Sequence, residues 1–271
     1  MKKNLFQINR SREPQSTLED RTEHIEIKGC YLCDGVKCCL FCNGYDEEII
    51  AMGTLAQWLL SISEENNMTI GDLLSNIFRI LNSESGKKNS IILIGASDAG
   101  KTLFANFLCS PWQDFEIGNF KLPTKTTCNS FWLENLPGAQ VYRCEEMILE
   151  NAEIIQLLKS LLEGNANLEA DIKYKSPISV PKRPVIITMN GDRKTDVTKF
   201  FSSEFEAINN RALILYFKKP MKLRIMDGDL NLLMQHSLYL IKVLMKKYYK
   251  KEEKKNTVLI DFCNSFTEQI L

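Results

Sequence analysis

The sequence has no excess of charge of either sign, no long apolar run and no internal repeat. Its 34 basic and 34 acidic residues cancel over 271 residues, which excludes a wholly basic coat for nucleic acid, although a few placed lysines can still grip a strand. No run of about eighteen apolar residues is present, and the polar N-terminus has no apolar signal core. We therefore expect an intracellular protein without a membrane anchor, with one main domain and a small N-terminal appendage.

Cysteines are unevenly spread along the chain. Five of the nine lie between residues 30 and 42, where Cys30, Cys33, Cys39 and Cys42 form a C-x2-C-x5-C-x2-C arrangement, with Cys38 as a spare ligand. Such crowding is more typical of reduced thiols or a metal site than of secreted disulfides. The spacing suits tetrahedral zinc, but the loop between the pairs is short. Two interpretations stay open, structural zinc or unliganded thiols in a small hairpin, with an iron–sulfur cluster as a third.

Apolar patterning predicts an α/β region with helical flanks. Short apolar runs predict buried strands at 90–94, 140–144, 184–189 and 212–217. Helical patterns are found at 46–60, 69–81, 103–109, 151–162 and 231–255. Interleaved strands and helices predict a central, mainly parallel sheet flanked by helices. We expect a flexible leader (1–28), a cysteine-rich knot (29–45), a helical collar for oligomerisation (46–84), the main α/β domain (85–225) and a C-terminal helical region (226–271).

A glycine-rich loop directly follows the first predicted strand. It fits the pattern G-x-x-x-x-G-K-[ST] at every fixed position and consists of Gly95, Ala96, Ser97, Asp98, Ala99, Gly100, Lys101 and Thr102. In such a loop the backbone N–H groups and the start of the next helix face the phosphates, the lysine meets the β- and γ-phosphates, and the Thr hydroxyl ligates Mg²⁺. The alternative is a chance strand–turn–helix match. Pattern and context agree, so we predict binding of ATP with Mg²⁺.

Polar groups also end two of the later strands. Glu145 and Glu146 follow the strand at 140–144, where one carboxylate can hold the magnesium shell and the other can orient the attacking water. Asn190 ends the strand at 184–189 and can hydrogen-bond the γ-phosphate or the lytic water. Taken alone, the acids are typical of a solvated helix start and the asparagine of a turn. Their order after the phosphate loop favours catalysis.

The order of these pieces resembles the superfamily 3 helicases. The phosphate loop, the acidic pair, a lysine-bearing stretch at 161–175, Asn190 and Asn210-Arg211 follow one another as in that family. The likeness is greatest to the large non-structural replication proteins of parvoviruses and their densovirus branch, over residues 70–220. It implies a P-loop fold of the AAA+ kind that hydrolyses ATP with Mg²⁺ and moves along single-stranded DNA as a ring, which we expect to be a hexamer.

The resemblance also implies a role for each motif residue. It assigns binding of ATP and Mg²⁺ to Lys101 and Thr102, and binding of the metal to Glu145. It assigns activation of the attacking water to Glu146 and sensing of the phosphate to Asn190.

Three basic residues complete the implied machinery. Lys173 and Lys175 match the hairpin that tracks a single strand through the ring, a task that suits sequence-independent phosphate contacts. Arg211 matches the arginine finger offered to the neighbouring subunit's ATP, where its planar charged fork can neutralise developing charge. The alternative is that all three are ordinary surface charges.

Some features depart from the family's pattern. Ala96 stands where the family's loops commonly have proline. The acidic residue near the phosphates, Asp98, is not a departure, because related viral helicases also have Asp there. The nicking endonuclease of the parvoviral proteins uses a His-x-His metal pair, whereas this sequence has only His24 and His236. We therefore expect no nicking activity. The lysine-rich stretch at 242–255 is interpreted as a solvated helix face, with nuclear import or a nucleic-acid contact as the alternative.

The sequence thus predicts an ATP-driven helicase or translocase acting on single-stranded DNA in viral-type DNA replication. We expect it to work as a homo-oligomer in the host nucleus, without contact to a membrane. Two other functions remain open: a motor that packages DNA, and a nucleotide-gated nucleic-acid-binding module without turnover.

Overall fold

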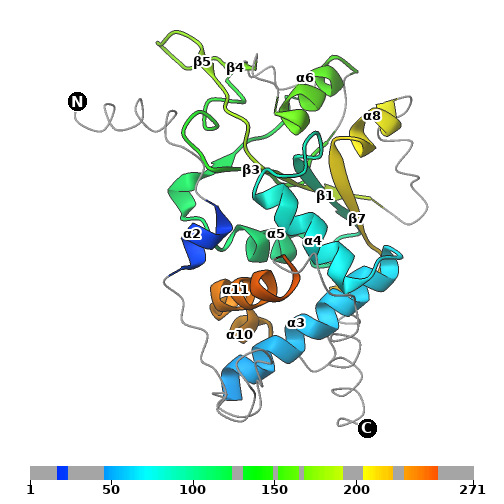
Figure 1. Cartoon of the computed structure of the whole chain (residues 1–271). Coiled ribbons are helices and arrows are strands. Elements are labelled where there is room, and N and C mark those ends of the chain that lie inside the picture. The colour runs from blue at the N-terminus through cyan, green and yellow to red at the C-terminus, as the bar shows by residue number, and fades with distance from the viewer. Residues whose placement is uncertain are drawn as a thin grey trace. The chain divides into compact units, whose positions relative to one another are not determined.

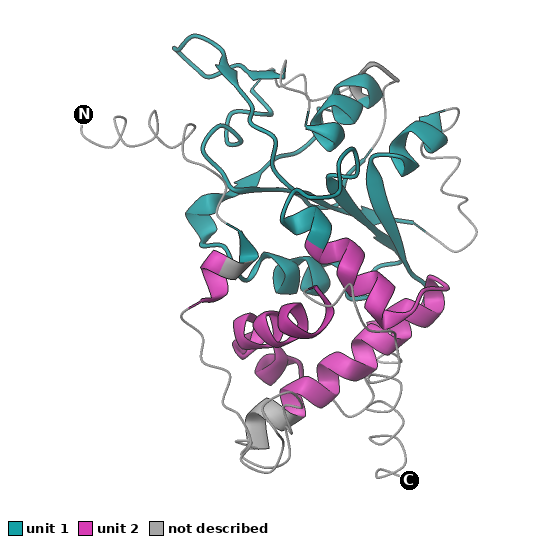
Figure 2. Ribbon diagram, in the orientation of Figure 1, with its two compact units in different colours: residues 1–18, 79–218 teal, residues 19–78, 219–271 magenta. Residues whose placement is uncertain are grey.

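The structure, a computed structural model, describes residues 17–23, 46–123, 131–148, 152–164, 168–191, 204–221 and 229–249. The chain divides into two compact units (Figure 2): residues 1–18 with 79–218 form unit 1, and residues 19–78 with 219–271 form unit 2. The cysteine arrangement from Cys30 to Cys42 lies outside the described residues, so zinc binding there stays a prediction.

A five-stranded sheet forms the centre of unit 1 (Figure 1). The strands lie in the order β2-β3-β6-β1-β7, and every neighbouring pair is parallel. Their bounds are β1 (Ser90–Gly95), β2 (Ile117–Asn119), β3 (Val141–Cys144), β6 (Val185–Asn190) and β7 (Ala212–Phe217). The predicted parallel sheet is confirmed. The side chains of the inner strands β1 and β6 are buried on both faces up to the exposed Asn190, which is why these strands read as continuous apolar runs.

The register aligns the ends of strands β1, β6 and β7. Ser90 pairs with both Val185 and Ala212, and five residues later Gly95 pairs with Asn190. Because the strands are parallel, the chain leaves β1, β3 and β6 at one common edge, the carboxyl edge of the sheet. The residue before β7, in contrast, lies at the amino edge.

Helices pack against this sheet and share its core. Helix α5 (Lys101–Cys109) contacts β1 and β6, and α8 (Phe205–Asn209) contacts β7 and α6 (Ala152–Glu163). The buried face of α6 carries Leu158, Leu161 and Leu162, which belong to the same apolar cluster as side chains of β1, β3 and β6. Short helix η1 (Asp114–Glu116) precedes β2.

A small hairpin extends from unit 1 at the top of Figure 1. Strands β4 (Glu169–Ala170) and β5 (Ile178–Ser179) pair antiparallel, and the Val180 N–H donates to the Leu168 carbonyl at 2.8 Å. The hairpin therefore presents residues 171–177 at its tip.

Unit 2 is helical and combines segments from both ends of the chain. It contains α3 (Asp46–Glu65), most of α4 (Ile70–Leu81), α10 (Leu230–Gln235) and α11 (Ser237–Tyr248). Helix α10 packs on α3, and the Asp229 N–H donates to Thr54 Oγ1 at 3.1 Å. The helix expected over 231–255 is interrupted at His236, and its residues after Tyr249 lie outside the described part.

The expected leader, 1–28, contains ordered structure. Residues Leu18–Thr22 form helix α2, the Leu18 side chain is fully buried, and its N–H donates to Asn82 Oδ1 at 3.0 Å. An apolar side chain that can be buried is enough to order a short polar segment. The leader is therefore not irregular throughout, and its residues other than 17–23 lie outside the described part.

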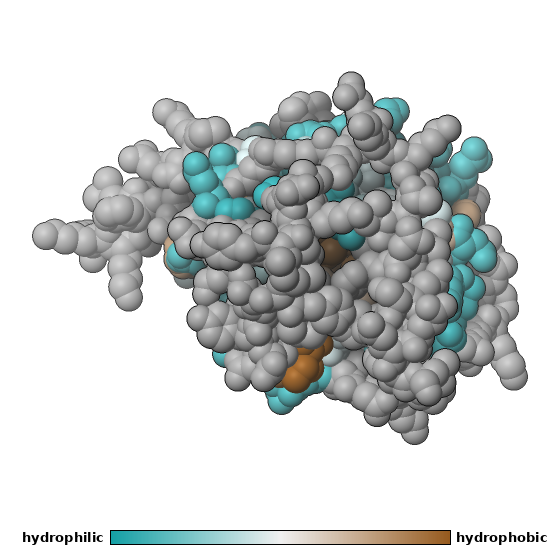
Figure 3. All heavy atoms as spheres, turned by 60° about the horizontal axis from the view of Figure 1, so that its bottom comes forward, coloured by the Kyte–Doolittle hydropathy of each residue, from teal (hydrophilic) through white to brown (hydrophobic). Residues whose placement is uncertain are grey.

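One face of the molecule shows the hydropathy of the described residues that are visible on it. In the view of Figure 3 most described residues are hydrophilic, with only a small hydrophobic area among them. Within the described ranges, no helix is long and apolar enough to cross a membrane.

Candidate functional site

The phosphate loop joins β1 to α5 at the carboxyl edge of the sheet. Gly95 is its first residue and pairs with Phe217; a Cβ there would overlap the Phe217 carbonyl oxygen, so only glycine fits. Gly100 has a left-handed backbone, with φ of 88°, and Asp98 has φ of 59°. Ala96, Ser97 and Asp98 are exposed, as a loop that receives phosphates must be.

Lys101 is buried at the first position of α5. Its Nζ donates to the Ala96 carbonyl at 2.6 Å, across the loop that it belongs to. Burial lowers the pKa of Lys101 from its ordinary value, while the charges of Glu146 and Asp98 partly oppose the shift. A buried ammonium with two acids nearby can exchange its carbonyl partner for a phosphate oxygen. Thr102, the next residue, is exposed and available to a metal ion.

The acidic pair follows β3 and turns sharply. Glu146 has a left-handed backbone, with φ of 49°, and its charge acts on Lys101. Glu145 forms an ion pair with Arg143 and remains 46% exposed. The structure therefore brings Glu146 to the phosphate loop, and it pairs Glu145 with an arginine of the preceding strand, β3.

Thr188 is a site residue that the sequence did not single out. This side chain of β6 is buried; its Oγ1 accepts from the Glu146 N–H at 2.9 Å, and its carbonyl accepts from the Met147 N–H at 2.8 Å. These two bonds tie the turn after β3 to the neighbouring strand. The one signal in the sequence is a hydroxyl side chain within an otherwise apolar strand, two residues before Asn190.

Asn190 ends β6 beside the phosphate loop. It pairs with Gly95 and is exposed, and the N–H of Gly191 donates to the Gly95 carbonyl at 3.0 Å. The structure thus brings the end of this strand together with the start of the phosphate loop, as its place in the sequence predicted.

Arg211 lies away from the phosphate loop, at the amino edge of the sheet. It directly precedes β7, whose first residue, Ala212, pairs with Ser90. Its guanidinium Nε donates to Glu163 Oε2 at 2.7 Å, and its Nη1 donates to the Ala207 carbonyl at 2.8 Å. The structure does not bring Arg211 together with the other predicted catalytic residues of the same copy.

The tip of the β4–β5 hairpin carries both predicted lysines and an aromatic ring. Lys173 and Lys175 are exposed, and Tyr174 between them is 94% exposed. Lys173 Nζ lies 5.5 Å from the centre of the Tyr174 ring, and Tyr174 has a left-handed backbone, with φ of 63°. Tyr174 was missed in the sequence, where its two lysine neighbours were the only signal.

The residues at the carboxyl edge fit ATP with Mg²⁺. A hydroxyl and carboxylates are the oxygen ligands that Mg²⁺ prefers, and a buried lysine with an exposed loop suits a polyphosphate. Among the described residues, no group of three or more His, Cys, Asp or Glu side chains is arranged to hold a metal ion.

Comparison with protein families identifies the fold and its relatives. The family model described as papillomavirus helicase matches residues 55–255, a span that includes the phosphate loop, the acidic pair, the hairpin and Arg211. Replication protein E1 of human papillomavirus type 41 is 30% identical over 139 residues, which are 51% of this chain and 21% of that protein.

The predicted likeness to parvoviral replication proteins is confirmed. Initiator protein NS1 of Aedes albopictus densovirus is 27% identical over 193 residues, 71% of this chain and 23% of that protein. The chain spans less than a third of the length of these curated relatives.

A solved structure supports the fold. An inhibitor-bound JCV helicase aligns with a TM-score of 0.51 and 15% identity, over 98% of this chain and 71% of that chain. At this identity, the shared feature is the fold. Since the family model matches most of its length, the chain belongs to the papillomavirus helicase family, within the ATP-dependent helicases of superfamily 3.

Proposed function

We propose that this chain is an ATP-driven helicase that moves along single-stranded DNA in viral-type DNA replication, and that it hydrolyses ATP between neighbouring copies of a ring. One observation carries the proposal. The phosphate loop, Glu146 and Asn190 lie at the carboxyl edge of the sheet, whereas Arg211 lies at its amino edge. Six-residue strands separate these edges by about 17 Å, at about 3.3 Å per residue, which is beyond the reach of one side chain.

Binding of the nucleotide is assigned to the phosphate loop. Lys101 leaves the Ala96 carbonyl and pairs with the β- and γ-phosphates, while the loop N–H groups and the start of α5 face the same charge. Thr102 and Glu145 hold Mg²⁺, which neutralises phosphate charge when it is bound with the nucleotide. Glu145 leaves its ion pair with Arg143 to do so.

Hydrolysis is assigned to Glu146, Asn190 and a partner arginine. Glu146, held by Thr188, accepts a proton from the attacking water, and Asn190 positions the γ-phosphate or that water. Arg211 of one copy approaches the triphosphate on the next copy and neutralises charge that develops on the γ-phosphoryl group. Within one copy, Arg211 is paired with Glu163 at the amino edge, away from the phosphate loop.

Contact with DNA is assigned to the hairpin tip. Lys173 and Lys175 attract phosphates without regard to sequence, and Tyr174 supplies a flat face on which a base can stack. A grip that ignores sequence suits a motor that must pass every base.

The test compares two variants of the purified protein. Lys101→Ala should abolish ATP hydrolysis and strand displacement, whereas Arg211→Ala should keep the ATP affinity and lose hydrolysis by about 1000-fold or more. Lys88→Ala and Arg79→Ala, which remove exposed charges of the same kinds elsewhere, are the matched controls. Hydrolysis that survives in Arg211→Ala would refute the shared site. A DNA-stimulated ATPase without strand displacement would favour packaging, and the absence of turnover would favour a binding module.

A further inference from the structure

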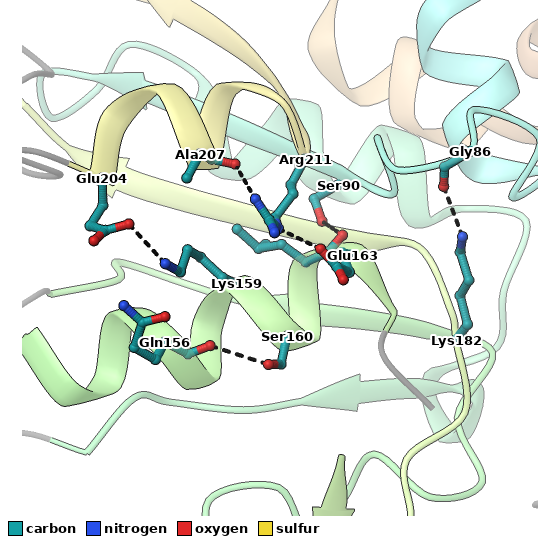
Figure 4. A network of polar contacts seen from close by, with 11 residues as sticks. Gly86, Ser90, Gln156, Lys159, Ser160, Glu163, Lys182, Glu204, Ala207 and Arg211 are labelled. Atoms are coloured by element: carbon teal, nitrogen blue, oxygen red, sulfur yellow. Dashed lines mark hydrogen bonds and ion pairs between the residues drawn. The ribbon is translucent and has the colours of Figure 1, made fainter. Parts of the chain in front are cut away.

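Glu163 holds the arginine of the proposed shared site, and nothing in the family resemblance assigned this residue a role. Figure 4 shows the contact: Glu163, at the end of α6, meets the guanidinium of Arg211, which precedes β7. Glu163 Oε2 accepts from Arg211 Nε at 2.7 Å, and the side chains are 29% and 21% exposed. The Ala207 carbonyl accepts from Nη1 at 2.8 Å. Two of the three guanidinium nitrogens are therefore fixed.

The position of Glu163 is unfavourable for the helix alone. A carboxylate in the last turn faces the negative end of the helix dipole, and α6 has no basic residue in that turn to offset it. Lys159, one turn earlier, pairs with Glu204 at 2.8 Å and not with Glu163. Helix stability thus does not explain an acid at this place, whereas the contact with Arg211 does.

The end of α6 is itself firmly held. Ser90 Oγ, at the start of β1, donates to the Leu162 carbonyl at 3.0 Å, and Leu161 and Leu162 are buried in the core. The ion pair between Lys159 and Glu204 joins α6 to the residue before α8 (Figure 4). Glu163 is therefore a rigid point on the sheet's amino edge, from which a long and flexible arginine side chain can be aimed.

We propose that Glu163 is a positioning residue for the arginine finger: it fixes Nε of Arg211 so that Nη2 is presented to the triphosphate of the neighbouring copy. The inference rests on the proposed function. Among the described residues, none accepts a hydrogen bond from Nη2. A guanidinium that is already oriented needs no reorganisation when charge develops on the γ-phosphoryl group, so the effect of Glu163 falls on kcat and not on ATP affinity.

The first experiment measures single-stranded-DNA-stimulated ATP hydrolysis of variants. Glu163→Ala should lower kcat by about 10-fold to 100-fold and leave the affinity for a fluorescent ATP analogue unchanged. Glu163→Gln keeps a side-chain oxygen that can accept a hydrogen bond from Nε of Arg211. Its kcat should therefore lie between those of the wild type and Glu163→Ala. Glu204→Gln weakens the ion pair that joins α6 to the residue before α8 without touching Arg211, so it measures the effect of loosening α6 alone and should lower kcat by less than Glu163→Gln does. Equal losses in Glu163→Gln and Glu204→Gln would show a merely structural role and overturn the inference.

A second experiment separates this inference from the proposed function. Lys101→Ala copies carry an intact finger, and Glu163→Ala copies carry an intact phosphate loop, so mixing the two should restore hydrolysis above either variant alone. A control mixture, in which Arg211→Ala copies replace the Glu163→Ala copies beside Lys101→Ala, tests the shared site itself. If that control mixture recovers and the Glu163→Ala mixture does not, Glu163 does not act through the finger. If the control mixture also fails, the shared site is wrong.

The double variant gives an independent result. If Glu163 acts through Arg211, Glu163→Ala should cause no further loss of kcat in the Arg211→Ala background. A further loss of the same size as in the wild-type background would overturn the inference.

Discussion

Replacing Thr188 with valine should loosen the turn that carries Glu145 and Glu146, and so lower kcat, while leaving the fold in place. Valine has nearly the same shape and a high preference for strands, so β6 keeps its packing. What is lost is the Oγ1 acceptor for the Glu146 N–H, at 2.9 Å. The Met147 N–H keeps its bond to the Thr188 carbonyl, so the turn is loosened at one point and not released.

The size of the effect follows from two comparable energies. A net intramolecular hydrogen bond stabilises by about 0.5–1.5 kcal/mol. The left-handed backbone of Glu146 costs about 1–2 kcal/mol. Without the acceptor this strain is no longer offset, and Glu146 relaxes towards an ordinary conformation. We expect Tm to fall by about 2–4 °C for a chain of this size, and a displaced carboxylate to lower kcat by about 10-fold to 100-fold.

The assay combines three measurements on Thr188→Val. Steady-state ATP hydrolysis with single-stranded DNA gives kcat, a fluorescent ATP analogue gives the nucleotide affinity, and scanning calorimetry gives Tm. The affinity should stay near that of the wild type, because the phosphate loop is untouched. Thr188→Ser, which keeps the hydroxyl, is the matched control and should retain most of kcat. A wild-type kcat in Thr188→Val would refute the reasoning, as would an equal loss in both variants.

Three further predictions concern the loop and the hairpin. Gly95→Ala should lower the free energy of unfolding, measured with denaturant, by about 1–3 kcal/mol or more, because the methyl group meets the backbone of Phe217. ATP affinity should fall as the pH rises through the lowered pKa of Lys101, below 10.5, since the neutral amine no longer attracts phosphate; Lys101→Arg should remove this pH dependence. Tyr174→Ala should weaken binding of a thymidine oligonucleotide by about 1–3 kcal/mol in anisotropy titrations, while Tyr174→Phe should not.

Much of the fold could be predicted from local sequence patterns. The strand at Ser90–Gly95 and the loop after it could be predicted because an apolar run and a fixed motif stand next to one another in the sequence. Strand β2, in contrast, has only three residues, with a glycine in the middle, and exists because Ile117 pairs with Val141. Such a strand has no periodicity of its own, so propensity could not reveal it.

The candidate site, like the fold, could be predicted only in part. The motif residues could be named from their order, but their partners come from distant parts of the chain: Thr188 lies 42 residues from Glu146, and Glu163 lies 48 residues from Arg211. Hydrogen bonds over such separations depend on which strands become neighbours, which no local pattern specifies. The pairing of Glu145 with Arg143 also depends on side-chain direction and was not expected.

The placement of the loop and of Arg211 at opposite edges of one sheet has a consequence for assembly. On the proposed mechanism, a lone copy carries two half-sites that can never meet each other. A second copy is therefore needed to complete each half-site. In the proposed ring the contacts are head-to-tail, so the amino edge of one copy faces the carboxyl edge of the next. Dilution should therefore abolish ATP hydrolysis at protein concentrations at which the individual chains still bind nucleotide.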